Sequence, residues 1–140
     1  MGKGLAPLIR LRRWRLDEER RQLSELVRAA DEATGRLTAL QAELERERNA
    51  AADVELFFAF AAFARSAEKR RLAAVEARRQ AEAAVLAQRE VVLLRHRELR
   101  SAELAEQARH HRLALEAARR EQGATDERAV LKHAAALRKF

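Results

Sequence analysis

The side chains that could support catalysis or bind a metal are 22 carboxylates and four histidines, which are His96, His110, His111 and His133. A zinc protease needs the spacing His-Glu-x-x-His on one helix, and none of these histidines has it. His111 falls on an apolar stripe, where we interpret it as a tolerated packing residue rather than a ligand. The sequence also has no glycine-rich loop that could hold a phosphate. We therefore predict that the protein is not an enzyme and uses no metal or cofactor.

Composition indicates the class of protein and its compartment. The chain has 140 residues, 36% of them charged, and no cysteine. Without cysteine there is no disulfide and no thiolate metal site, which suits a reducing compartment. We find neither a signal peptide nor an apolar run near the roughly 18 residues that span a bilayer. These features predict a cytoplasmic protein made of long helices.

The positive charge is placed at the two ends of the chain. Residues 1–15 hold five basic residues and no acid, residues 126–140 carry a net charge of +2, and the stretch between is neutral. Arginines flanking Trp14 in the segment RLRRWR are a pattern that binds nucleic acid or an anionic membrane surface. However, three acids follow at 17–19, so the basic field is short. Nucleic-acid binding is kept as an alternative to a protein-binding role.

A seven-residue apolar repeat runs through the first half of the chain and predicts a coiled-coil helix. Its two sets of positions lie three residues apart. They are Leu16, Leu23, Ala30, Leu37, Leu44, Ala51 and Phe58, and Glu19, Leu26, Ala33, Leu40, Glu47, Val54 and Ala61.

A second apolar stripe in the other half of the chain offers a partner for the first. We take it to consist of Leu72, Val75, Leu86 and Leu93, continued by Leu104, Ala108, His111, Leu115 and Ala118. Two such stripes in one chain predict an all-α fold, a long antiparallel two-helix coiled-coil hairpin. Pairing between two parallel chains is the alternative that the pattern leaves open.

The boundaries of the two helices follow from stop and start signals. We predict a first helix over about 7–48, a turn at about 49–53 and a second helix over about 54–122, with a turn near Ser66 as the alternative. Gly123 and Thr125 predict a break, followed by a short C-terminal helix or helical extension over 125–140. All of this forms a single unit.

Four of the five phenylalanines, Phe57, Phe58, Phe60 and Phe63, lie close together where the second helix starts. At about 100° per residue, Phe57 falls on the predicted second stripe and Phe63 well outside it. Below Phe63 on the same line come Ala67, Arg70 and Ala74. We interpret Phe57 and Phe58 as a plug for the end of the hairpin. We expect the line from Phe63 to Ala74 to be uncovered and to bind a partner.

The chain resembles the FliJ family of the bacterial flagellar type III export apparatus. The resemblance rests on the opening PLIRLRRWRLDEERRQLSEL and on Phe60-Ala-Ala-Phe63 followed by Glu68-Lys69, and it extends over nearly the whole chain. It implies a hairpin similar to the central stalk of rotary ATPases. The stalk of a virulence type III secretion system has the same shape, and the sequence does not separate the two machines.

The resemblance also implies partners and their contact residues. The two termini would dock into the ring of the export ATPase, FliI, and the turn end would meet the cytoplasmic domain of the export gate, FlhA. Export chaperones would be further partners, and the protein would sit peripherally on the inner membrane at the flagellar base. The implied gate contacts are Phe60, Phe63, Ala67, Arg70 and Ala74. The implied ATPase contacts are Arg10, Arg12, Arg13, Trp14, Arg138 and Lys139. The two basic termini are expected to meet at the end opposite the turn.

Overall fold

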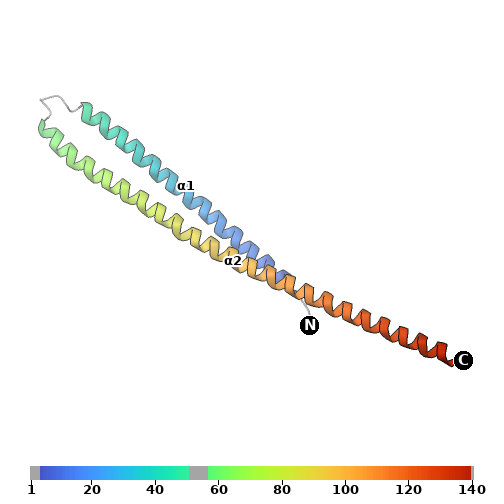
Figure 1. Cartoon of the computed structure of the whole chain (residues 1–140). Helices are drawn as coiled ribbons and strands as arrows, with labels where there is room; N and C mark the ends of the chain where they lie inside the picture. The colour runs from blue at the N-terminus through green and yellow to red at the C-terminus, as the bar shows by residue number, and fades with distance from the viewer. Residues whose placement is uncertain (1–3, 51–56, 140) are drawn as a thin grey trace. The chain divides into compact units, whose positions relative to one another are not determined.

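Two long helices make up the described part of the chain. The computed structural model describes residues 4–50 and 57–139, and it contains α1 (Ala6–Ala50) and α2 (Phe57–Arg138) (Figure 1). No strand occurs in these residues. The all-α class is therefore confirmed. Of the turn predicted at about 49–53, residues 49 and 50 belong to α1, so that part of the prediction is wrong. Residues 51–53 and the predicted start of the second helix at 54 lie outside the described residues.

Helix α1 begins where Pro7 predicts a first turn, because a proline there loses no helical hydrogen bond. The helix continues through Asn49 and ends at Ala50. Gly35 does not interrupt it. The hydroxyls of Thr34 and Thr38, on either side, donate to the carbonyls of Ala30 and Thr34, each at 3.0 Å, and so stay within the helix.

Helix α2 passes through both positions at which the sequence suggests a break. Ser66 lies within it, so the alternative turn near that residue is excluded. The expected break at Gly123 is also absent. Thr125, which we took for a new helix cap, instead donates its hydroxyl to the carbonyl of Glu121 at 2.9 Å, and this bond keeps it inside the helix. The C-terminal segment is thus a helical extension.

The chain divides into two compact units, and both helices contribute to each. One unit consists of residues 14–96 and the other of residues 1–13 with 97–140. In the unit of residues 14–96, α1 and α2 lie side by side and run in opposite directions (Figure 1). This is the predicted helical hairpin.

The side of α1 that packs against α2 is the one that the heptad repeat predicts. Its most buried residue in the middle of the helix is Leu37, with 5% of its surface exposed. The buried members of the repeat are Leu16, Ala30, Ala33 and Leu37, and the half-buried ones are Glu19, Leu23, Leu26, Leu40 and Leu44. Glu47 is exposed, so the packed face ends at Leu44 in the described part of α1.

The predicted packing face of α2 is wrong. Leu72, Leu86 and Leu93 are exposed, with 53%, 60% and 42% of their surfaces accessible. The residues of α2 that are covered in this unit are instead mostly small ones. They are Phe63, Ala67, Arg71, Ala74, Ala81, Ala84, Val85, Gln88, Val91, Val92 and Arg95.

Complementary size explains this choice of face. Alanines recur at Ala67, Ala74 and Ala81, one every seven residues, so they form a shallow strip along α2. The packed face of α1 carries larger residues such as Leu37, and two helices pack best when large residues face small ones. Our prediction ranked each stripe by its own hydrophobicity, although packing depends on how two stripes fit together.

Candidate partner-binding surfaces

The line of residues that we expected to be uncovered lies against α1. Phe63, Ala67 and Ala74 are each half-buried, and Arg70 forms an ion pair with Glu43 of α1, with 3.6 Å between Nη2 and Oε1. The expectation of an open strip is therefore wrong for Phe63, Ala67 and Ala74, whereas Arg70 is exposed. Phe60 belongs to α2, but its side chain, like those of Phe57 and Phe58, lies outside the described residues. The predicted plug at the end of the hairpin lies there too.

A groove runs between the two helices at the end of the hairpin that is nearer the turn. We call it the turn-proximal groove. Phe63 forms part of one wall, and Leu44 of α1 lies on the other. The remaining lining residues are Gln41, Glu45 and Arg48 from α1, and Ala64, Ala67, Glu68 and Arg71 from α2. The groove combines an aromatic ring with both signs of charge, which is the composition of a protein-binding surface rather than of a reactive site.

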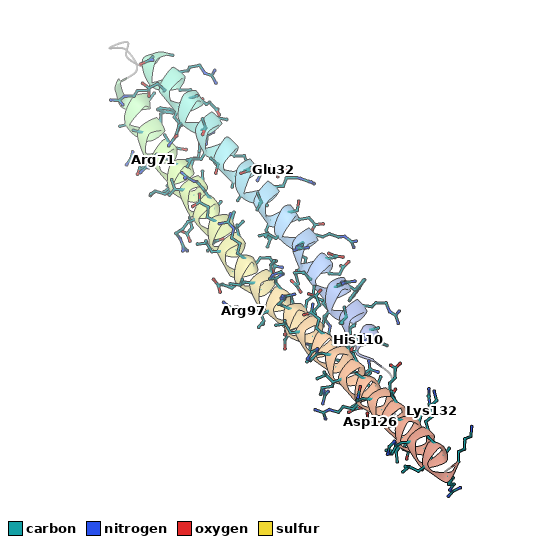
Figure 2. All side chains as sticks on the ribbon, turned by 45° about the vertical axis from the view of Figure 1, so that its right-hand side comes forward. Glu32, Arg71, Arg97, His110, Asp126 and Lys132 are labelled. Carbon is teal, nitrogen blue, oxygen red and sulfur yellow. The ribbon has the colours of Figure 1, made fainter. Side chains whose placement is uncertain are left out.

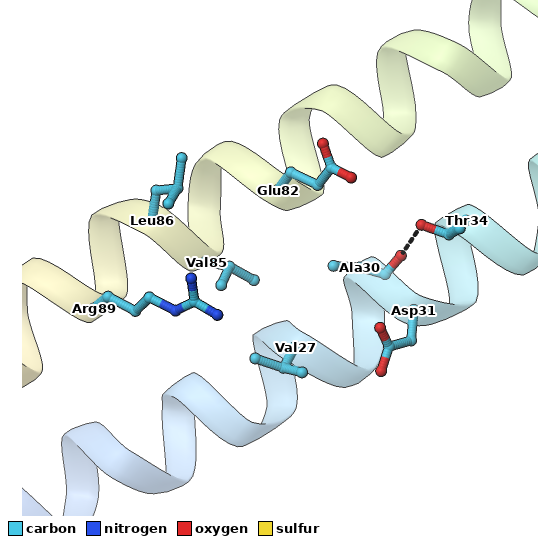
Figure 3. Close-up of a pocket in the computed structure, with 8 residues that line it drawn as sticks. All are labelled: Val27, Ala30, Asp31, Thr34, Glu82, Val85, Leu86 and Arg89. Atoms are coloured by element: carbon cyan, nitrogen blue, oxygen red, sulfur yellow. Dashed lines mark hydrogen bonds between the residues drawn. The ribbon is translucent and has the colours of Figure 1, made fainter.

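A second groove lies half-way along the hairpin, where Ala30 of α1 faces Val85 of α2 (Figure 3). Its other lining residues are Val27, Asp31, Thr34, Glu82, Leu86 and Arg89. The small Ala30 side chain leaves this gap between the helices. We find no pair of titratable groups here that is set up for catalysis, and the described residues hold no cluster of three or more potential metal ligands.

Exposed carboxylates of α2 near these grooves are stabilised by arginines one turn later. Arg71 donates two hydrogen bonds to Glu68, and Arg79 does the same to Glu76, at 2.6–3.0 Å. These bonds lower the pKa of both glutamates. Such pairs on an exposed face contribute little to stability. The surface there carries charged groups, but each pair has no net charge.

In the unit of residues 1–13 and 97–140, two of the predicted ATPase contacts are used within the chain. Arg12 donates from Nη1 to the backbone carbonyl of Glu98 at 2.6 Å, and Arg13 pairs with Glu103 at 3.5 Å. Both bonds fasten the start of α1 to α2. Arg10 is exposed. Trp14, in the other unit, has 60% of its surface accessible.

The start of α1 lies beside a carboxylate of α2. The backbone N–H of Leu5 donates to Oε2 of Glu106 at 2.8 Å, and Arg109 and His110 contact Oε1 of the same side chain at 3.2 and 3.0 Å. The bond from Leu5 is the main reason that the pKa of Glu106 lies below its ordinary value, and the charges of Arg109 and His110 lower it further. Glu106 therefore supplies an N-terminal cap that the side chains of Gly4 and Leu5 cannot provide.

Beyond Arg109, α2 continues without a neighbouring helix in the described part of its unit. We call residues 111–138 the C-terminal arm. Every residue of the arm except Ala124 is exposed, and side chains such as Asp126 and Lys132 project from it (Figure 2). Its exposed large apolar residues are Leu113, Leu115, Val130, Leu131 and Leu137. Arg138 and Lys139 lie at its tip and are exposed.

We expected the two basic ends of the chain to meet, but they lie far apart. Leu5 contacts Glu106, whereas Arg138 lies 32 positions further along the same helix. At 1.5 Å per residue this separation is roughly 48 Å. The predicted boundaries, about 7–48 for the first helix and about 54–122 for the second, already made the second helix the longer one. The expectation that the two ends meet did not take this difference into account.

The chain matches a protein-family model over nearly its whole length. Residues 1–138 match the family model described as FliJ, flagellar FliJ protein. A search of curated proteins found no match, and neither did a search of solved structures. Within the described residues, neither helix has an apolar stretch that is long enough to cross a membrane.

Proposed function

Because the chain belongs to the flagellar FliJ family, we propose that it is the stalk that links the export ATPase, FliI, to the export gate, FlhA. Family membership makes it a component of the flagellar export apparatus. The family is a structural export component, and we propose no enzymatic activity and no cofactor for this member.

The C-terminal arm supports an ATPase-binding role. It is a single helix with exposed leucines and valine on its surface and two basic residues at its tip. A helix of this kind gains stability by burying its apolar side chains in a partner. We propose that the arm enters the opening of the ATPase ring and that Arg138 and Lys139 contact acidic groups there. Arg10 and Trp14 are exposed and make further contacts, whereas Arg12 and Arg13 act by holding α1 in place.

At the other end, we propose that the gate binds over the turn-proximal groove. Ala67 and Ala74 are partly covered by α1, so they contribute through the packing that shapes the surface. Phe63 is half-buried, and Arg70 is paired with Glu43 across the hairpin. The gate would contact the accessible edge of the Phe63 ring and the Arg70 guanidinium, together with Phe60. Export chaperones are proposed as transient partners.

We also propose that the protein works on the cytoplasmic side, bound peripherally to the inner membrane at the flagellar base through the gate. The family description is flagellar, which favours the flagellar machine over a virulence secretion system. Nucleic-acid binding by the basic start of α1 is the weaker alternative, because Arg12 and Arg13 are already bonded to α2.

Secretion of flagellar subunits tests this function. We would delete the gene in its own host and restore it with the wild-type chain, with Arg138→Glu/Lys139→Glu, or with the matched reversal Arg36→Glu/Arg46→Glu on the exposed side of α1. The wild-type and the control should restore secretion, and the arm variant should not. If deletion leaves secretion unchanged while the chain binds RNA in a salt-sensitive way, the alternative is favoured.

A further inference from the structure

An aliphatic stripe on α2 has no partner among the described residues of its unit. It consists of Leu72, Val75, Leu86 and Leu93, and we call it the outer stripe. All four side chains are exposed, Leu86 the most at 60%. Figure 3 shows Leu86 pointing away from α1, whereas Val85 points toward it. Leu86 also borders the groove between the two helices, so the outer stripe lies beside the packed face of α2. A helix that shows exposed aliphatic residues next to its packed face has a second surface to bury.

The spacing of the outer stripe fits a helical partner. Leu72, Leu86 and Leu93 occur at multiples of seven residues, and Val75 follows Leu72 by three, so the stripe has the a and d positions of a coiled coil. The two positions between Val75 and Leu86 in this pattern are Arg79 and Glu82. The middle of the stripe therefore carries one positive and one negative charge, three residues apart.

These two charges determine whether a second α2 helix would fit in the parallel or the antiparallel direction. In a parallel pair of α2 helices in register, Arg79 would face Arg79 and Glu82 would face Glu82, which is unfavourable. In an antiparallel pair with a two-fold axis between positions 80 and 81, Arg79 faces Glu82 of the second copy, and the symmetry makes this pair twice. The same alignment places Val75 against Leu86 of the second copy, also twice. Leu72 then lies opposite Arg89 and Leu93 opposite Glu68, so the apolar contact is confined to the centre of the stripe.

We propose that the centre of the outer stripe, from Val75 to Leu86, is a self-association surface, through which a second copy of this chain binds antiparallel along α2. Arg79 now bonds Glu76, and Glu82 bonds Arg78 at 3.0 Å. These four side chains are 44–66% exposed, so exchanging these partners across the dimer costs little. This inference does not depend on the export role.

Sedimentation equilibrium of the full chain tests the association. The wild-type protein should be a dimer that dissociates on dilution. Leu86→Glu should weaken the dimer about tenfold or more, because it places a charge in the apolar contact. Leu113→Glu, a matched change at an exposed leucine of the arm, should leave the dimer intact. A wild-type chain that stays monomeric at its solubility limit overturns the proposal, as does equal weakening by both variants.

A charge exchange identifies the partner as a second copy. Arg79→Glu and Glu82→Arg should each weaken the dimer, and the double variant Arg79→Glu/Glu82→Arg should restore it, because the exchanged charges again face each other. Circular dichroism of each variant checks that the helices remain intact. Failure of the double variant to recover, while its helices are intact, contradicts the proposed pairing.

Cross-linking tests the direction, and the chain helps because it contains no other cysteine. A mixture of Val75→Cys and Leu86→Cys chains should form disulfides between the two variants. Val75→Cys alone should not, since two copies of position 75 would lie about 16 Å apart in the antiparallel pair, which is beyond the reach of a disulfide. Efficient cross-linking of Val75→Cys with itself would show a parallel pair and overturn the alignment.

Discussion

The carboxylate of Glu106 caps α1 across the helix pair, because its Oε2 accepts a hydrogen bond at 2.8 Å from the backbone N–H of Leu5, 101 positions earlier. A helix start leaves four N–H groups without partners inside the helix. The residues before α1, Gly4 and Leu5, have no side chain that can cap it. The first turn of α1 is thus held by α2.

This cap should depend on pH. The folded chain lowers the pKa of Glu106 below its ordinary 4.5, mainly through the Leu5 hydrogen bond. A lowered pKa means that the stabilisation is present above about pH 4.5 and is lost as the pH falls through the folded value. We expect the Leu5 amide signal in NMR spectra to shift as acid is added below that pH. In Glu106→Gln this titration should be absent, and an unchanged titration in the variant would contradict the cap.

Gly4→Ala tests the same contact, because the added methyl group would lie too close to the Glu106 side chain. A Cβ at Gly4 would lie 2.6 Å from Oε1 of Glu106 and 3.0 Å from Nη1 of Arg109. The side chain of Glu106 can move, so we expect the helix pair to remain and the cap to weaken. Hydrogen exchange of the amides in the first turn of α1 should become faster. Gly35→Ala, where nothing lies within 4 Å, should slow exchange slightly or leave it unchanged, because alanine favours a helix.

Because one leucine of α2 is buried and another is exposed, replacing each by alanine should change the free energy of unfolding by different amounts. Leu99 is 8% exposed and Leu72 is 53% exposed. Leu99→Ala should lower the free energy of unfolding by about 2–4 kcal/mol, and Leu72→Ala by less than about 1 kcal/mol. Urea unfolding followed by circular dichroism measures both. A larger loss for Leu72 would restore the packing face that we first predicted.

Phe63 now belongs to the packed face, so its truncation should affect stability as well as binding. Because the ring is half-buried, Phe63→Ala should lower the free energy of unfolding by about 1–3 kcal/mol, less than for a fully buried phenylalanine. Binding of the folded variant to the cytoplasmic domain of the gate should also fall. If binding is unchanged while stability drops, the ring is purely structural and our gate contact is wrong.

The polar contact between Gln88 and Glu19 is expected to define how α1 and α2 align, while it makes the hairpin less stable than an apolar pair would. Nε2 of Gln88 donates to Oε2 of Glu19 at 2.5 Å and to its backbone carbonyl at 3.0 Å. Gln88→Ala should destabilise the hairpin by about 1 kcal/mol. Replacing both residues by leucine should make it more stable, because the polar groups no longer need partners. A double variant less stable than wild type in thermal unfolding would show that the contact contributes net stability.

The sequence predicted the class, the hairpin and the face of α1 because each depends on local pattern. Leucines at multiples of seven residues, such as Leu23, Leu37 and Leu44, all lie on one face of a helix, and this face is the one that packs. The face of α2 was not predictable from apolar content, since Ala67, Ala74 and Ala81 bury less surface than the exposed leucines do. Their seven-residue spacing was the available signal. The predictions of a break at Gly123 and of an alternative turn near Ser66 were wrong, because a long helix tolerates a single residue of low helix propensity.

The surroundings of the candidate contact residues were harder to predict, because they depend on which residues of α1 lie beside α2. Arg12 and Arg13 read as free positive charge, although the structure bonds both to α2. The resemblance implied the tip residues Arg138 and Lys139, and the structure leaves both exposed. No local pattern could indicate Glu106 as a cap, since its partner lies 101 positions away.

The most direct test of the account is binding of the purified export ATPase to this chain, measured by titration calorimetry. We expect the wild-type chain to bind. Leu131→Glu, at a position that is 68% exposed in the arm, and Arg138→Glu/Lys139→Glu should each weaken binding about tenfold or more. The control Arg36→Glu/Arg46→Glu should bind as the wild type does. Arm variants that bind as tightly as the wild type would contradict the stalk.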